Sequence, residues 1–439
     1  MACIKLLTHT ESGFQAWLCV VGAFLFIIPS FGSMQSIGTI QSYLYLSQLK
    51  TYSIGPVGWI TGLYLFLSYF LNIQVGPLCD SYSPTLIVPI GALTTTASFL
   101  LLAVCSQYWQ FMLCLSVFGA AGGAILGALA VSVIAQSSYF VRRRGVAMGI
   151  ALTGSSTGSI IIPIMLRSTF PNLGWAWSIR LMAFVIGTIT ALGAACFMPY
   201  FLTAATRNAG TTAQAQPSRG AGGRRIALVD LTAFKSVPFI FLSLAMCLLE
   251  FAIFAIAGLL PTLATTGSSS FTGENSANSY TLIAVLSAGS CPGLIIPGIA
   301  TNLVGPFNVI LIMTALTLVF MGSLFIPFAG KSEGVLYAFS ALWGFGSGSF
   351  LSMAEVILWT ICLGATCDLR SYGRFYGTMT FLVNFAVLLA VPLSGLMLDH
   401  LGTRPLTSLL TGDLFLGVVF YILARGALLG RWLSLRQKV

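Results

Sequence analysis

The sequence consists of long apolar runs that are separated by short polar segments. A run of about 20 apolar residues is long enough to span a lipid bilayer as one helix. Twelve such runs begin near the following residues: Gln15, Val57, Leu86, Gln110, Gly145, Trp175, Ser236, Asn278, Phe307, Gly334, Arg374 and Leu406. The pattern therefore predicts an all-α polytopic membrane protein with twelve transmembrane helices.

A polar segment divides the predicted helices into two sets of six. Residues 203–235 are basic and rich in small polar residues, which is typical of a flexible linker. This division predicts one six-helix bundle at 15–202 and another at 236–429. The short tails 1–14 and 430–439 flank the two bundles.

The two halves also resemble each other at corresponding places. Gly76-x-x-x-Asp80 follows the second predicted helix, and Gly298-x-x-x-Asn302 follows the eighth. Two similar six-helix units related by an axis along the membrane normal form the major-facilitator fold of secondary transporters. The sequence therefore predicts this fold, with the two bundles as pseudo-repeats.

The distribution of lysine and arginine along the chain predicts how the protein is oriented in the membrane. Charged residues make up only 7% of the chain, against about 25% in soluble domains. The net charge of +10 could suggest a nucleic-acid partner, but fifteen of the 20 lysines and arginines fall in the predicted inner segments and four in the outer loops. Basic residues concentrate on the cytosolic side, so both termini are predicted to be cytosolic. We expect a lipid bilayer as the surroundings, and no nucleic acid.

Other kinds of chemistry are not indicated. The sequence has no nucleophile–base arrangement, nucleotide-binding loop or spacing of metal ligands. We therefore expect a protein that is not an enzyme and that needs neither a cofactor nor a metal.

Glycine and proline are concentrated in the eighth and tenth predicted helices. The segments are GSCPGLIIPG at 289–298 and GFGSGSF at 344–350. Proline removes a backbone donor, so these two helices are predicted to be flexible or interrupted. Interrupted helices at matching depths commonly mark the binding site of such transporters.

Three segments resemble a known family. They are YFVRRRGVAMGIALTGSSTGSIIIPIM (139–165), GWAWSIRLMAF (174–184) and SYGRFYGTMTFLVNFAVLLAVPLSG (371–395). They are similar to the fungal branch of the monocarboxylate porter family, and the similarity extends from Phe14 to about Leu429, the linker excepted. The resemblance implies a major-facilitator transporter, often proton-linked, for monocarboxylates or other small organic molecules. Many fungal relatives export secondary metabolites, and others move compounds such as riboflavin.

The chain departs from the family at the residues that hold a carboxylate. Family members usually carry G-R-x-x-P-G in helix eight, whereas this chain has Leu294 in place of the arginine. The acidic position beyond the proline is Asn302, and the lysine that animal members carry in helix one corresponds to Gln35. A guanidinium binds a carboxylate through two parallel hydrogen bonds, which leucine cannot make. We therefore expect a cargo other than a simple monocarboxylate.

Three charged residues lie inside predicted spans. Glu250 would cost about 2.5–3.5 kcal/mol at a helix centre, so it should face the bundle interior or a wet cavity. Removal from water favours the neutral form of a carboxyl, so Glu250 is a candidate for proton coupling or cargo contact; the alternative is a permanently protonated, structural acid. Glu355 could face the same cavity or pair with inner arginines. Arg180 could form an ion pair or an outer gate, or it could offset an anionic cargo.

The remaining candidates are neutral cavity residues and inner charges. Trp343 and Trp359 could line the cavity or pack between helices, and Gln35, Leu294 and Asn384 complete the predicted cavity wall. The candidates for an inner gate are Asp80, Arg142, Arg143, Arg144, Arg370 and Arg374. Arg142 to Arg144 should also set orientation and contact lipid phosphates.

These features predict a secondary transporter that works by alternating access. We expect it to export a secondary metabolite or similar small organic compound, with proton exchange as a candidate energy source. The alternatives are proton-linked uptake of a monocarboxylate or a vitamin-like nutrient, and a ligand sensor that does not transport. We expect a monomer in the plasma membrane, with the vacuolar membrane as the alternative.

Overall fold

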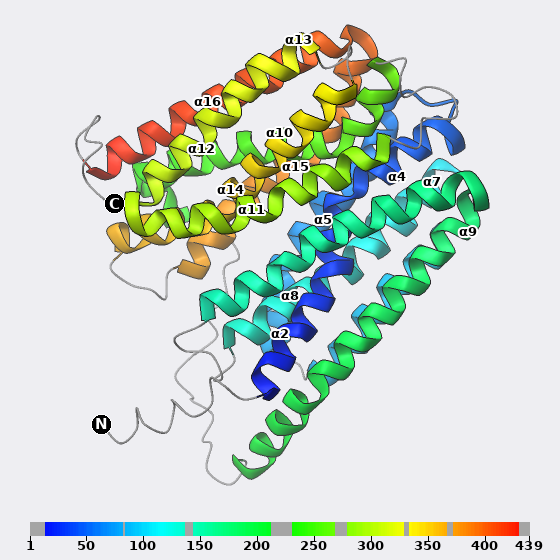
Figure 1. Ribbon diagram of the computed structural model, residues 1–439. Coiled ribbons are helices and arrows are strands. Elements are labelled where there is room, and N and C mark those ends of the chain that lie inside the picture. Colours follow the sequence, from blue (N-terminus) through cyan, green and yellow to red (C-terminus); the bar gives the residue numbers. More distant parts are fainter. Residues whose placement is uncertain are drawn as a thin grey trace.

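The computed structural model describes residues 14–81, 84–136, 144–211, 231–267, 279–328, 333–366 and 372–429. Nearly all of these residues are helical, and the helices lie side by side as long rods (Figure 1). Eight helical segments of the described chain are long and apolar enough to cross a membrane, and one of them, 149–198, contains two helices. The protein is therefore a multi-pass membrane protein.

The N-terminal half of the chain forms six helical rods. The first rod is α2 (Phe14–Ile27), η1 (Ile28–Gly32), α3 (Ser33–Gln35), α4 (Ile37–Tyr43) and η2 (Leu44–Gln48). The second and third are α5 (Ile54–Ser81) and α6 (Pro84–Leu102), and the fourth is α7 (Tyr108–Phe111), η3 (Met112–Gly119) and α8 (Ala120–Gln136). The fifth and sixth rods together make up α9 (Arg144–Thr211).

The C-terminal half begins with a short helix, η4 (Leu231–Lys235), and also forms six rods. They are α10 (Val237–Gly267), α11 (Thr281–Val304), α12 (Pro306–Phe320) continued by η7 (Met321–Phe325) and α13 (Ile326–Phe328), α14 (Glu333–Thr366), α15 (Tyr372–Leu401) and α16 (Thr403–Leu429). All twelve rods begin within three residues of the predicted starts. The prediction of a twelve-helix fold is confirmed.

The turn inside α9 depends on one glycine. Gly174 has φ = +67° and ψ = −176°, a backbone conformation that residues with a Cβ rarely adopt. It reverses the chain between the fifth and sixth rods. The sixth rod then continues as a helix to Thr211, so residues 203–211 extend α9, where the sequence predicted the start of the linker.

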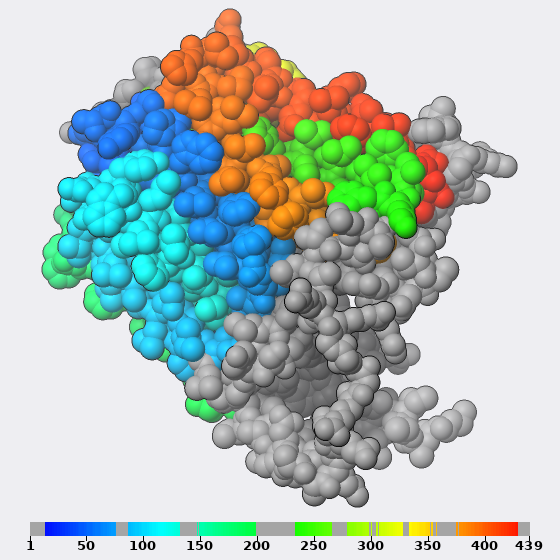
Figure 2. All heavy atoms as spheres, turned by 180° about the vertical axis from the view of Figure 1, so that it is seen from behind, coloured from blue at the N-terminus to red at the C-terminus, as the bar shows by residue number. Residues whose placement is uncertain are grey.

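The halves of the chain form two helical groups that meet along α5 and α15 (Figures 1 and 2). We call the end of the molecule with Phe14, Thr211 and Val237 the linker end, and the opposite end, with Gly174 and Gly402, the far end. Figure 2 shows α5 and α15 lying against each other across one face of the molecule. This contact connects the two groups.

The eighth and tenth rods differ from the prediction. Both α11 and α14 are continuous helices, and Pro292 and Pro297 lie inside α11. The glycines have a packing role instead: a Cβ on Gly344 would collide with the carbonyl oxygen of Leu286, and one on Gly293 with that of Phe345. The prediction of interrupted helices is therefore wrong, because these glycines let two unbroken backbones approach closely.

Candidate functional site

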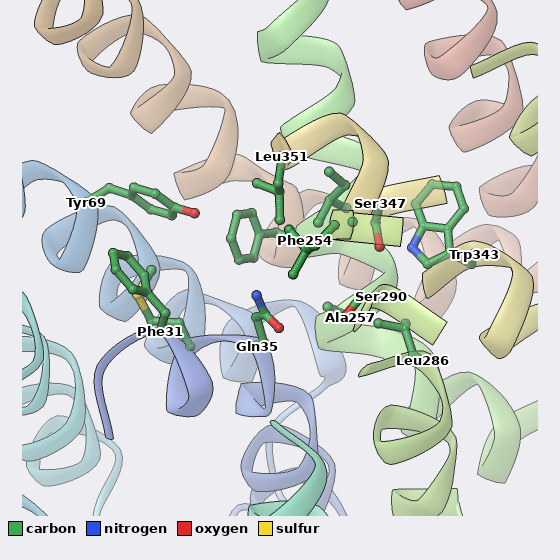
Figure 3. Close-up of a pocket in the computed structure, with 14 residues that line it drawn as sticks. Phe31, Gln35, Tyr69, Phe254, Ala257, Leu286, Ser290, Trp343, Ser347 and Leu351 are labelled. Atoms are coloured by element: carbon green, nitrogen blue, oxygen red, sulfur yellow. The ribbon is translucent and has the colours of Figure 1, made fainter. Parts of the chain in front are cut away.

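A cavity lies between the two helical groups, where helices of both halves face each other (Figure 3). The first rod and α5 form its N-terminal wall, and α10, α11 and α14 form its C-terminal wall. The lining residues are Phe31, Met34, Gln35, Tyr69, Ile253, Phe254, Ala257, Leu286, Ser290, Leu294, Trp343, Ser347, Gly348 and Leu351. A site shared by two pseudo-repeats is where substrates bind in this architecture.

The lining residues recur at helical spacing on each wall. On α11 they are Leu286, Ser290 and Leu294, four residues apart, which places them on one face of the helix. Sequence reasoning found Leu294 but missed Leu286 and Ser290. It could have found them by taking the residues one and two turns before Leu294. The same rule applied to Gln35 gives Phe31, one turn earlier.

Polar groups enter the cavity from three sides. Figure 3 shows the Tyr69 hydroxyl and the Trp343 ring nitrogen directed toward the middle, with the Gln35 amide below them. The Ser159 hydroxyl donates a hydrogen bond to Gln35 Oε1 at 3.2 Å, which holds the amide in place. The Ser290 hydroxyl lies 3.1 Å from that of Ser156 on α9 and so connects the two halves.

The cavity wall is otherwise apolar. Nine of its residues are hydrophobic, Trp343 among them, and Phe254 projects into the middle, edge-on to Tyr69 with ring centroids 5.8 Å apart. Among the fourteen described residues that line the cavity, none carries a charge. Such a surface can hold a ring system by stacking and can orient it through a few neutral hydrogen bonds. It provides no ion pair for an acid.

The predicted cavity residues fall into three groups. Gln35, Leu294 and Trp343 lie in the cavity wall. Asn384, on α15, is fully buried and lies outside the set of lining residues. Trp359 is a helical position of α14 whose side chain lies outside the described part of the structure.

Glu250 also lies outside the cavity wall. It is on α10, one turn on the linker side of the lining residue Phe254. Its side chain is 6% exposed, and its Oε2 atom has no hydrogen-bond partner among the described residues. A buried polar atom without a partner is rare in proteins, and it commonly has a functional explanation.

The other intramembrane charges are away from the cavity. The Arg180 guanidinium lies 5.0 Å from the ring centroid of Trp177, whose side chain is 59% exposed. This cation–π contact is on the outer surface of α9, and Arg180 is not among the residues lining the cavity. The side chain of Glu355 lies outside the described residues.

Three of the six candidates for an inner gate are helical positions at the linker end. Asp80, Arg144 and Arg374 are helical positions of α5, α9 and α15, but their side chains lie outside the described residues. Arg142, Arg143 and Arg370 lie wholly outside them. Their gating role stays a prediction.

Close backbone packing closes the cavity at the far end. A Cβ on Gly38 of α4 would collide with the carbonyl oxygen of Ala257 on α10 and lie 2.9 Å from that of Gly258. On α5, a Cβ on Gly58 would lie 3.0 Å from Pro392 Cα of α15. Glycines thus allow the N-terminal and C-terminal halves to touch on the far side of the cavity.

Side chains strengthen this closure. Gly55 donates its backbone N–H to Asp399 Oδ2 at 3.0 Å, so a carboxylate of α15 caps the N-terminus of α5. Arg167 donates to the Thr281 hydroxyl at 3.0 Å across the same boundary. An aromatic cluster includes Tyr43 and Phe170, stacked with centroids 3.9 Å apart. The structure is therefore a conformation with its far end closed.

Comparison with protein families agrees with this architecture. The family model described as Major Facilitator Superfamily matches residues 19–385. The solved structure of the peptide transporter POT in complex with sulfate superimposes with a TM-score of 0.71, covering 96% of this chain and 98% of that one. Only 12% of residues are identical, so this likeness concerns the fold alone.

Fungal transporters are similar in sequence. A riboflavin transporter of Saccharomyces cerevisiae is 30% identical over 89% of this chain and 73% of its own length. The aspyridones efflux protein of Emericella nidulans is 27% identical over 89% of this chain and 74% of its own. The matches extend across both halves of the chain.

Proposed function

This chain belongs to the Major Facilitator Superfamily and is a membrane transporter rather than an enzyme, and from that premise we propose that it exports an uncharged or weakly acidic organic compound of the secondary-metabolite type. Transport proceeds by alternating access: the cavity opens first toward the linker end and then toward the far end. The two six-helix units, 15–202 and 236–429, rock about the cavity between them. The protein works as a monomer.

The observation that carries this proposal is the uncharged, largely apolar cavity, in which four of the fourteen described lining residues are aromatic. A simple carboxylate needs a cationic partner to offset its loss of water, and the fourteen described lining residues provide none. A ring-bearing molecule instead gains from stacking against Phe254, Phe31 and Trp343 and from hydrogen bonds to Gln35 and Tyr69. The name of the Emericella relative, an efflux protein, supports export of such a molecule.

Orientation follows from the basic residues. The predicted inner segments carry fifteen of the 20 lysines and arginines, and the described helices begin or end next to these segments at the linker end, so we place this end in the cytosol and the far end outside. The plasma membrane is the proposed location, and export runs from the linker end to the far end. Glu250 is the proposed proton-coupling residue, because it is a buried acid next to the cavity wall.

The test is cargo flux by the purified full chain in proteoliposomes with an imposed pH gradient. The probes are an aspyridone, riboflavin and lactate. We expect the gradient to drive the aspyridone and to leave lactate near the rate of protein-free vesicles. Lactate as the best-transported probe would contradict the proposal. Riboflavin as the best probe would favour nutrient transport, which the Saccharomyces relative suggests by its name.

The missing guanidinium can be restored in the cavity. Leu294→Arg places a cation in the wall of α11, and a hydrogen bond to a charged group contributes about 1.5–3 kcal/mol. We expect the apparent affinity for lactate to rise by roughly tenfold or more. The measurement is inhibition of aspyridone flux by lactate.

Leu294→Gln is the matched control, since it adds polarity without charge. It should leave lactate inhibition as weak as in the wild type. If Leu294→Arg reaches the membrane in normal amounts and lactate still does not bind, then the missing arginine does not explain carboxylate exclusion.

A further inference from the structure

Helix α10 carries polar groups on the same face that lines the cavity. Ala257 lines the cavity, and Glu250 and Ser243 lie seven and fourteen residues before it, which is about two and four turns. Both side chains are buried, and both Glu250 Oε2 and Ser243 Oγ lack a hydrogen-bond partner among the described residues. Between the cavity and the linker end, this face of α10 thus carries two buried polar atoms that lack a hydrogen-bond partner among the described residues.

Asn384 lies at the same level on the neighbouring helix α15. Two contacts fix the register of α10 and α15: the rings of Phe239 and Phe375, with centroids 5.1 Å apart, and the position of a Cβ on Gly258, 2.8 Å from Val391. Glu250 follows Phe239 by eleven residues and Asn384 follows Phe375 by nine, so counting along the two helices places both residues at about the same level. Asn384 is fully buried, and neither its Oδ1 nor its Nδ2 has a hydrogen-bond partner among the described residues.

The described surroundings of Glu250 leave its charge uncompensated. Cys247 on α10 and Tyr421 on α16 are its titratable neighbours, and the Tyr421 hydroxyl donates to Met246 Sδ at 3.0 Å. The other described charged and titratable groups on the elements packed against α10 are Arg404, Asp413 and Arg425 on α16, Asp399 and His400 on α15, Glu333 and Tyr337 on α14, Cys291 on α11, Tyr43 on α4 and Lys235 on η4. None of these forms an ion pair with Glu250 within the described part of the chain.

We propose that Glu250 and Asn384 form a binding site for a hydrated proton between α10, α15 and α16, separate from the cargo cavity. Hydronium transfers its proton to the Glu250 carboxylate; one O–H bond forms, one breaks, and water remains. An amide suits this role, since Nδ2 donates to the carboxylate and Oδ1 accepts from the protonated acid, directly or through water. Asn384 is a positioning residue that acts through Glu250.

Separation of the two sites determines how coupling works. Glu250 lies on the same rigid helix as the cavity residues Ile253 and Phe254 and the far-end contact at Gly258. A proton on Glu250 therefore does not compete with cargo for the same atoms. It instead changes the equilibrium position of α10, which both the cavity and the far-end closure share. This inference rests on the proposed proton-coupled transport.

The experiment is infrared difference spectroscopy on the purified full chain, with no cargo present, between acid and alkaline pH. A protonated carboxylic acid gives a carbonyl band. The band of this kind that is present in the wild type and missing in Glu250→Gln is assigned to Glu250. In Asn384→Leu we expect this band to move in frequency and its pH midpoint to move by about one unit or more. Asn308→Leu is the matched control, because Asn308 is a buried asparagine of α12 whose amide donates to Val304 O at 2.9 Å.

Each further outcome decides the proposal. Gln35→Ala should leave the Glu250 band unchanged, since Gln35 belongs to the cavity; an equal shift in both variants would overturn the separation of the sites. An unchanged band in Asn384→Leu would overturn the role of Asn384. A band shift on replacing choline by sodium at constant pH would make it a sodium site. Because no cargo is used, a failure of the transport proposal is measured separately, by flux.

Discussion

Glu250→Gln is expected to abolish the cargo accumulation that a pH gradient drives. With one proton exchanged per cargo molecule, one unit of pH gradient sustains an accumulation ratio of about tenfold, since a tenfold ratio corresponds to about 1.4 kcal/mol. Glutamine is neutral and cannot release a proton, so the ratio should fall to about one. The measurement is steady-state accumulation of the aspyridone in proteoliposomes at several imposed gradients.

Cargo exchange measured without a pH gradient distinguishes a loss of proton coupling from a loss of folded protein. Glu250→Gln should still exchange labelled against unlabelled aspyridone, because the glutamine lies outside the cavity wall. Asp413→Asn is the matched control: Asp413 is another partly buried acid with an unpaired Oδ2 among the described residues, on α16. If Asp413→Asn also abolishes accumulation, or if Glu250→Gln keeps it, then Glu250 is not the coupling residue.

Gly38→Ala is expected to shift the protein toward a conformation with its far end open. The new Cβ would collide with the Ala257 carbonyl oxygen only while α4 and α10 are in contact. Overpacking costs about 1–3 kcal/mol, which changes the ratio of open to closed molecules by roughly fivefold or more. Turnover should fall, because a transporter must visit both conformations.

Spin labels at Lys50→Cys and Arg404→Cys measure this shift. Both positions are exposed at the far end, one in each half, and the six described cysteines are buried or partly buried. We expect a longer mean distance between the labels in Gly38→Ala. Gly412→Ala is the control, since a Cβ there meets nothing within 4 Å. An unchanged distance distribution in Gly38→Ala would show that this contact does not determine the equilibrium.

The helical fold could be predicted closely from the sequence. Span length depends only on bilayer thickness, so the apolar runs gave all twelve helix starts to within three residues. The glycine-rich segments were harder to interpret. Glycine and proline permit both a broken helix and a close helix contact, and only the neighbouring backbone distinguishes them. At Gly344 that neighbour is the carbonyl of Leu286, on another helix.

The candidate site was predicted only in part. Gln35, Leu294 and Trp343 lie in the cavity wall, but Asn384 lies outside it, and the cargo role of all four stays a prediction. A soluble helix shows which side faces inward by its polar stripe, whereas a span surrounded by lipid is apolar on every side. Which face of α15 points toward the cavity therefore depends on its packing against α5 and α10. That packing cannot be recognised in the sequence of the span alone.

The hydrogen bond from Gly55 to Asp399 has a consequence for comparative studies. Its donor is a peptide group, so the bond places no demand on the side chain at position 55, which is kept small by another contact: a Cβ there would lie 2.5 Å from Leu396 Cγ. Correlated substitution between the two positions will therefore be weak. Methods that infer contacts from residue covariation will not detect this hydrogen bond. The acid at 399, in the last turn of α15, and the glycine at 55 will then look like two unrelated preferences.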